Sequence, residues 1–192
     1  MPTATGNSGA LSLGVGTLHY APLGSTLPTD LSTALDTAFK AIGYTDEGSE
    51  FSYEISSDPV EVAESLDPVF YKTTGRNGSV SFAMAENTAR NLTLAFNGGT
   101  VTKTTSGATK YEPPEPGTEV RRTLVFTSED GQERWVFPQV FQGASVSLAR
   151  RKGADKTVIS VEFRLEKPAL GGAPFTAYYA AVRDGGSGVP AS

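Results

Sequence analysis

The strongest constraint on the fold is a strict alternation of apolar and polar side chains late in the chain. Within residues 157–165 (TVISVEFRL), four apolar side chains occupy every second position: Ile159, Val161, Phe163 and Leu165. The positions between them carry Ser160, Glu162 and Arg164. Successive side chains of a strand point to opposite faces, so this run predicts a strand with one buried and one polar face.

A second alternating run precedes it and predicts a long hairpin over residues 143–165. Val146 and Leu148 alternate with Ser145 and Ser147, and the basic, glycine-containing stretch ARRKGADK joins the two runs. An earlier pair of runs predicts another hairpin over residues 119–142, turning at 129–131. We therefore expect a β-meander.

The remaining strands are predicted less regularly. Residues 16–28 and 76–84 each favour a strand, and residues 173–182 favour a last one. Residues 47–75 alternate as well, but Pro59 and Pro68 interrupt them, which predicts edge or irregular strands.

Two segments are predicted to be helical. The main helix is expected over residues 29–42, where apolar side chains recur at helical spacing after Thr29 and Asp30, and where Gly43 suits a left-handed end. A short second helix is expected over residues 87–97. Between it and the hairpins, residues 99–119 predict a long loop of the kind that is usually functional or disordered.

Length and composition indicate one mainly β domain with flexible ends. We expect an N-terminal arm over residues 1–16, a single domain over 17–182 and a C-terminal tail over 183–192. The chain of 192 residues contains no cysteine, which excludes disulfides and thiolate sites. It shows neither a signal peptide nor a membrane-spanning run of about 18 apolar residues.

The sequence contains no recognisable catalytic, metal-binding or nucleotide-binding motif. The net charge is −5, which disfavours tight binding of nucleic-acid phosphates. His19 is the one histidine and lies in a predicted strand, so no catalytic triad or multi-histidine metal site is indicated. No phosphate-binding glycine motif is complete, and the acidic clusters lack calcium-loop or glycosidase spacing. We therefore expect no catalytic residue, metal or cofactor.

The order of elements resembles a known family of virion proteins. The stretches APLGSTLPTDLSTALDTAFKAIGYTDEG, VSFAMAEN with LTLAFNGG, and the run from Arg122 to Pro168 are similar to major tail tube proteins of long-tailed, non-contractile bacteriophages, particularly those of actinobacterial hosts. The resemblance covers most of residues 16–168. It implies a β-sandwich or barrel-like domain flanked by a helix, with subunits that form six-membered, stacked rings.

The resemblance also implies partners and surfaces. The partners would be further copies of the chain, a tape-measure protein and tail tip or terminator proteins. Genomic DNA would pass through the lumen without specific binding. The virion would be assembled in the host cytoplasm, without a membrane. The expected lumen-facing residues are Ser145, Ser147, Ser160, Glu162 and Arg164. The expected inter-ring contacts, besides the N-terminal arm, are Arg150, Arg151, Lys152, Lys103, Lys110, Tyr111, Glu112 and Glu115.

Two other functions remain open on the sequence. A carbohydrate- or cell-surface-binding β-sandwich would expose aromatic side chains on one face, whereas most aromatic residues here fall on the apolar phase of their strands. A small β-type hydrolase would need convergent carboxylates in a pocket, and the sequence alone does not pair them.

Overall fold

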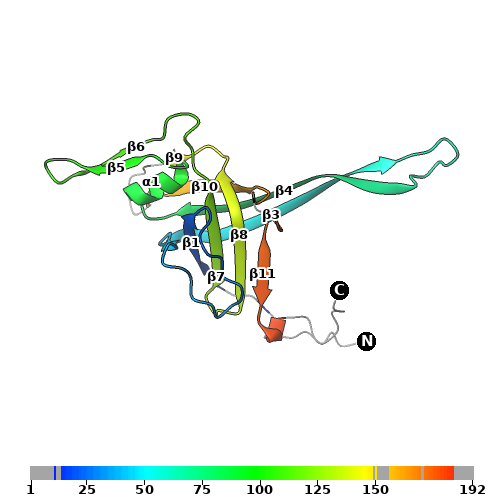
Figure 1. Ribbon diagram of the computed structural model, residues 1–192, viewed down its shortest axis with the longest axis horizontal. Helices are drawn as coiled ribbons and strands as arrows, with labels where there is room; N and C mark the ends of the chain where they lie inside the picture. The colour runs from blue at the N-terminus through cyan, green and yellow to red at the C-terminus, as the bar shows by residue number, and fades with distance from the viewer. Residues whose placement is uncertain (1–10, 12–13, 149, 151–155, 170, 184–192) are drawn as a thin grey trace.

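The computed structural model describes residues 11, 14–148, 150, 156–169 and 171–183, and these form a mainly antiparallel β fold with one α-helix (Figure 1). The strands are β1 (Gly16–Pro22), β2 (Lys40–Ala41), β3 (Thr45–Val60), β4 (Phe70–Met84), β5 (Thr100–Lys103), β6 (Thr109–Glu112), β7 (Arg122–Ser128), β8 (Glu133–Gln142), β9 (Ser147–Leu148), β10 (Ile159–Leu165) and β11 (Thr176–Tyr179). The helix α1 spans Ala89–Ala95, and a 3-10 turn, η2, spans Ala181–Arg183. The predicted β class is confirmed and is consistent with a β-sandwich-like architecture.

One large sheet organises the molecule. Its strands follow the order β2-β1-β7-β8-β10-β4-β3, with β11 paired to β8 and β9 paired to β10. Strands β5 and β6 form a separate hairpin beside α1 (Figure 1). β10 therefore lies inside the sheet, between β8 and β4, while β3 lies at its edge.

The alternating side chains build two apolar clusters on opposite faces of the sheet. The main core includes Ile159, Val161 and Phe163 of β10, as their alternation predicted, and these are at most 4% exposed. Leu124 of β7 joins this core, whereas its neighbour Val125 joins the second cluster with Ala21, Phe39 and Val136. Consecutive residues of β7 thus serve different clusters, because they point to different faces.

The expected main helix over residues 29–42 is wrong. This segment contains turns and the two-residue strand β2. The Asp30 carboxylate accepts hydrogen bonds from the backbone N–H groups of Ser32 and Thr33, and the Asp36 carboxylate accepts one from Ala38. Such local bonds compete with helical ones, so the Ser-, Thr- and Asp-rich segment folds as turns.

A buried arginine holds the same segment on the sheet. Arg134 of β8 is 8% exposed, and its guanidinium donates hydrogen bonds of 2.8 Å to the carbonyl oxygens of Asp30 and Thr33. Leu35 and Ala38 still pack on the second cluster. The apolar pattern therefore indicated burial correctly but not helical geometry.

The short second helix is confirmed as α1. Its N-cap is Thr88, whose hydroxyl accepts a hydrogen bond from the Asn91 backbone N–H at 3.2 Å. The buried Asn91 amide donates to the carbonyls of Ile42 and Glu86, which ties the helix to the chain before β3. Asn97, with φ +55°, follows the helix end in the left-handed region.

The predicted hairpins are confirmed in part. Strands β7 and β8 form the expected hairpin around residues 129–131, and β11 is the expected last strand. The long hairpin over 143–165 is confirmed only over a short stretch: β9 has two residues and pairs at Ile159↔Leu148 and Ser160↔Ser147, because β8 pairs with Phe163–Leu165 on the same edge of β10.

Two other segments are more regular than expected. Residues 45–84 form the longest strands, β3 and β4, despite Pro59. β3 is an edge strand, as the proline suggested, and such a strand tolerates the missing N–H. The expected loop over 99–119 contains the β5–β6 hairpin. The expected N-terminal arm over 1–16 and C-terminal tail over 183–192 lie mostly outside the described residues.

Candidate functional site

A polar surface lies across β3, β4 and β10, and we call it the polar face. The register places Ser160 opposite Ala83, Glu162 opposite Ser81, and Arg164 opposite Ser79. β4 is paired in turn with β3 at Ser79↔Ser52, Ser81↔Glu50 and Asn77↔Glu54. Paired residues in a sheet point to the same side, so these side chains form one continuous face opposite the main core.

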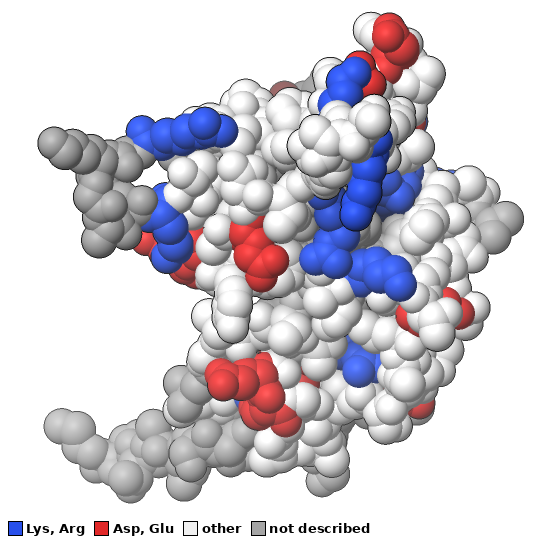
Figure 2. Space-filling view, turned by 90° about the vertical axis from the view of Figure 1, so that its left-hand side faces the viewer, with Lys and Arg blue, Asp and Glu red and all other residues white. Residues whose placement is uncertain are grey.

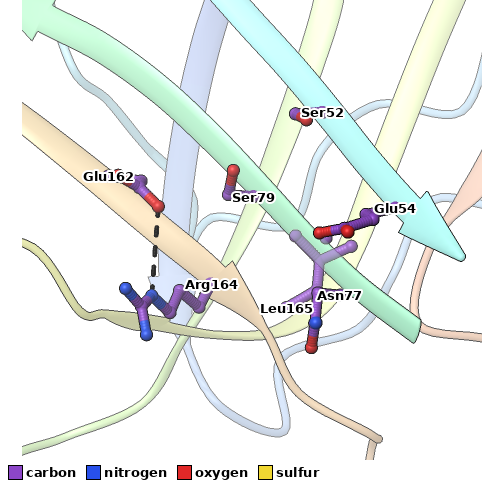
Figure 3. Close-up of a pocket in the computed structure, with 8 residues that line it drawn as sticks. Ser52, Glu54, Asn77, Ser79, Glu162, Arg164 and Leu165 are labelled. Carbon is purple, nitrogen blue, oxygen red and sulfur yellow. Dashed lines mark ion pairs between the residues drawn. The ribbon is translucent and has the colours of Figure 1, made fainter. Parts of the chain in front are cut away.

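The polar face is shallowly hollowed. One hollow of about 430 Å³ is lined by Ser52, Glu54, Asn77, Gly78, Ser79, Glu162, Arg164 and Leu165 (Figure 3). A neighbouring hollow of about 300 Å³ is bordered by Asp46, Glu50, Ser81 and Ser160, among others. Serine hydroxyls and carboxylates make up most of the polar groups in both hollows.

The charge of the polar face is mainly negative. Four carboxylates lie on it, those of Asp46, Glu50, Glu54 and Glu162. Two cations are paired with members of this set. Arg164 lies 3.9 Å from Glu162, and Lys156 lies 2.6 Å from Asp46. Four negative and two positive charges leave a net charge of −2.

The polar face has no evident catalytic arrangement. Within the described residues, no group of three or more His, Asp or Glu side chains is placed to hold a metal ion. His19 lies elsewhere, on β1 opposite Val125, and burial together with the nearby Arg134 lowers its pKa. No helix of the described part of the chain is long and apolar enough to cross a membrane.

Sequence reasoning identified part of this face. Ser147 pairs with Ser160, so the register joins four of the five expected residues: Ser147, Ser160, Glu162 and Arg164. Ser145 is exposed two residues before β9, and no strand pairing places it on the face. The contributions of β3 and of Ser79 and Ser81 were missed. The alternation of Ser79, Ser81 and Ala83 against Val80 and Phe82 was the signal that could have found the β4 part.

A second surface is the distal part of the β3–β4 hairpin, residues 55–76, which we call the arm. It extends from the body as a two-stranded ribbon (Figure 1). Near its end, Pro59 pairs with Tyr71 and Val60 with Phe70, so both faces of the ribbon carry apolar groups. Phe70 is 55% exposed, Tyr71 is 66% exposed, and Leu66 at the turn is completely exposed.

Such exposure is unusual for a soluble monomer. A two-stranded hairpin is marginally stable by itself in water, and contiguous exposed apolar groups mark interaction sites. The arm is therefore a candidate contact with another protein surface.

The β5–β6 hairpin holds most of the other expected contact residues. Lys103, Lys110, Glu112 and Glu115 are exposed, and Lys110 lies 2.7 Å from Glu112. Tyr111 is partly buried: its hydroxyl donates to the Gly98 carbonyl at 3.0 Å and its ring stacks on Phe96. It therefore attaches the hairpin to the end of α1. Arg150 is exposed, whereas Arg151 and Lys152 lie outside the described residues.

The aromatic side chains do not form an open platform. Trp135, Phe51 and Phe175 pack against one another with ring centroids 5.0 to 5.6 Å apart, next to the main core. Tyr179 is 46% exposed, but its ring packs edge-on against Trp135, while the adjacent Tyr178 packs on the second cluster. Most aromatic side chains in this region therefore serve packing.

Basic side chains gather at the end of the molecule opposite the arm. Arg90 of α1 and Arg122 of β7 both act on Tyr20 of β1, where they oppose the rise that burial causes in the tyrosine pKa. The Arg122 guanidinium lies over the Tyr20 ring, 5.9 Å from its centroid. Figure 2, which views the end that carries α1 and β5–β6, shows Lys and Arg side chains clustered near its centre.

Comparison with known proteins identifies one matching family model. A family model described as Phage tail tube protein matches residues 3–158, which is more than half of the chain. A search of curated proteins finds no match.

Proposed function

The chain belongs to the phage tail tube protein family, and we propose that its copies close into six-membered rings that stack into the conduit for the genome. Membership makes it a structural protein of the virion tail. The ring number, the stacking and the passage of DNA are our proposal. We also propose that the tail is long and non-contractile, in keeping with the residues that resemble that group.

One observation carries the proposal of self-assembly, namely the exposed apolar arm. Phe70, Tyr71 and Leu66 have no cover within the described part of the subunit. Burial of such side chains is worth about 1.5–3 kcal/mol each, which a neighbouring copy would supply. The edge strand β3 also has unpaired backbone groups along one side, and a closed ring of copies covers such edges.

We assign the polar face to the lumen. Its hydroxyl groups and net charge of −2 suit passing DNA, because a basic wall would bind phosphates and retard them. The pairing of Arg164 with Glu162 offsets the one cation that β10 contributes. During assembly the same wall would surround a tape-measure protein, with tip and terminator proteins at the tube ends, in the host cytoplasm.

We assign contacts between rings to β5–β6 and to the basic stretch from Arg150. Lys103, Lys110 and Glu112 are exposed on this hairpin, and Glu115 is exposed three residues after it. Both signs of charge are present, which allows complementary pairing with the next ring. Tyr111 contributes by holding the hairpin in place.

Negative-stain electron microscopy across a concentration series, beside light scattering, tests the proposal. We expect rings or hollow tubes of uniform diameter for the natural sequence. The triple variant Leu66→Ser, Phe70→Ser, Tyr71→Ser should stay monomeric and folded. A matched triple variant of exposed body residues, Thr26→Ser, Thr29→Ser and Thr37→Ser, should assemble normally. A natural protein that stays monomeric at every concentration, even with purified tail tips as nuclei, would contradict the proposal.

A further inference from the structure

The basic end of the subunit contains arginines without an acidic partner. Among the described residues, neither Arg90 nor Arg122 has a carboxylate oxygen within 4 Å. The Nε atom of Arg122 is buried and has no hydrogen-bond partner there. A buried donor without a hydrogen-bond partner is costly, and a planar carboxylate or phosphate is the group that best satisfies a guanidinium.

The tip of the arm has the opposite character. Residues 58–72 contain four carboxylates, Asp58, Glu61, Glu64 and Asp67, and one cation, Lys72, for a net charge of −3. Asp58 stands opposite Lys72 in the register. The other three carboxylates are exposed and make no ion pair within the described part of the chain. They are interspersed with the exposed apolar residues Val62 and Leu66.

In Figure 1 the arm tip lies at the far right, whereas α1 and β7, which carry the two arginines, lie in the body to the left. The two surfaces cannot meet within one copy, but they can meet between copies. A contact between different surfaces of identical subunits is heterologous, and repetition of it produces closed rings or open stacks. The charge difference would also orient the subunits during encounter.

We propose that the acidic arm tip of one copy docks on the basic end of another, where Arg90 and Arg122 receive a carboxylate of Glu61, Glu64 or Asp67. This inference rests on the proposed function, since it names the contact that joins the copies. Leu66 and Phe70 would pack beside the ion pairs and exclude water from them.

Charge reversal tests the pairing. The variant Arg90→Glu and the triple variant Glu61→Lys, Glu64→Lys, Asp67→Lys should each raise the critical concentration for assembly at least tenfold, as measured by sedimentation velocity. Arg90 is exposed on α1, so its replacement should leave the fold intact. The control Lys167→Glu, which changes net charge equally at an exposed site after β10, should assemble like the natural protein.

Combining the substitutions of both surfaces in one chain tests whether the two surfaces contact each other. A chain that carries both Arg90→Glu and the three lysines restores complementarity, so it should recover most of the assembly. Two results would overturn the inference and leave the proposed function intact. In the first, Arg90→Glu and the triple lysine variant each assemble at the same critical concentration as the natural protein. In the second, both variants lose assembly and the combined chain does not recover it. DNA binding by the natural protein would be measured in a gel-shift assay. If Arg90→Glu abolished that binding and left assembly unchanged, the basic end would be a phosphate site, and the inference would also be overturned.

A second measurement works without tubes. The chain has no cysteine, so Leu66→Cys on the arm tip and Thr93→Cys, one turn from Arg90, are unique thiols. When Leu66→Cys and Thr93→Cys are mixed and oxidised with diamide, disulfide-linked heterodimers should form rapidly. A control mixture of Leu66→Cys and Thr37→Cys should form them more slowly. Equal rates would overturn the inference. Failure of the natural protein to form rings with nuclei would instead count against the proposed function.

Discussion

At the scale of single residues, Arg134 decides the conformation of residues 27–39. Its guanidinium satisfies two carbonyls of that segment while being 8% exposed. We expect Arg134→Met to lower the free energy of unfolding by about 2 kcal/mol, because both carbonyls lose a charged donor. Urea unfolding in the arm triple variant, which keeps subunits apart, provides the measurement.

The control is Arg121→Met, which removes an exposed ion pair to Glu166 and should lower the free energy of unfolding by less than about 1 kcal/mol. Equal losses would refute the role of Arg134.

Asp30 in the same segment gives a pH-dependent contribution. Hydrogen bonds from Thr33, and then from Ser32, lower the pKa of its carboxyl from 3.8 to about 2. The folded-state pKa lies below the unfolded one, so the charged carboxylate stabilises the fold above about pH 4, and this contribution disappears as the pH falls toward 2. The variant Asp30→Asn should therefore be less stable at pH 7 and converge with the natural protein near pH 2. A difference in urea midpoint that is independent of pH would contradict this.

At the scale of elements, the base of β5–β6 depends on the absence of a side chain at Gly99. Its φ is +98°, and a Cβ there would collide with the Glu112 carbonyl oxygen and come within 2.8 Å of the Tyr111 ring. Gly107 at the hairpin turn has φ +83° with open space around it. We expect Gly99→Ala to open the hairpin and abolish protection of its amides from hydrogen exchange. Gly107→Ala, which shares only the backbone strain of about 1 kcal/mol, should keep that protection. Protection retained in both variants would show that the hairpin tolerates the collision.

At the scale of the whole molecule, the assignment of the polar face to a lumen predicts its accessibility. In assembled tubes, a thiol at Ser79→Cys should react with a small maleimide that enters the channel. It should resist a maleimide on a large dextran, because the ring would enclose it. In unassembled subunits the same thiol should react with both reagents, because no ring then encloses it. Reaction of Ser79→Cys with the dextran reagent along intact tubes would place the polar face outside.

Across the whole molecule, the predictions from sequence that succeeded are those that rest on local patterns. Ile159, Val161 and Phe163 are buried as predicted, because a period of two constrains every side chain of a strand whatever its neighbours are. The β7–β8 turn, which contains Gly131, and a short helix were also predicted from local patterns, although the helix is capped by Thr88 and spans Ala89–Ala95 rather than residues 87–97. Part of the polar face followed from the same alternation, through Ser160, Glu162 and Arg164.

The sequence by itself determined the β class, the faces of β10 and the absence of thiol chemistry. Only the tertiary structure showed how the turns after Asp30 are held on the sheet, because Arg134, which binds the carbonyls of Asp30 and Thr33, lies about a hundred positions away. Only the tertiary structure joined β3 and β4 to β10 in one polar face and extended them into an apolar arm. Strand pairing of this kind depends on contacts between distant segments, and no local pattern in the chain encodes which segments will meet.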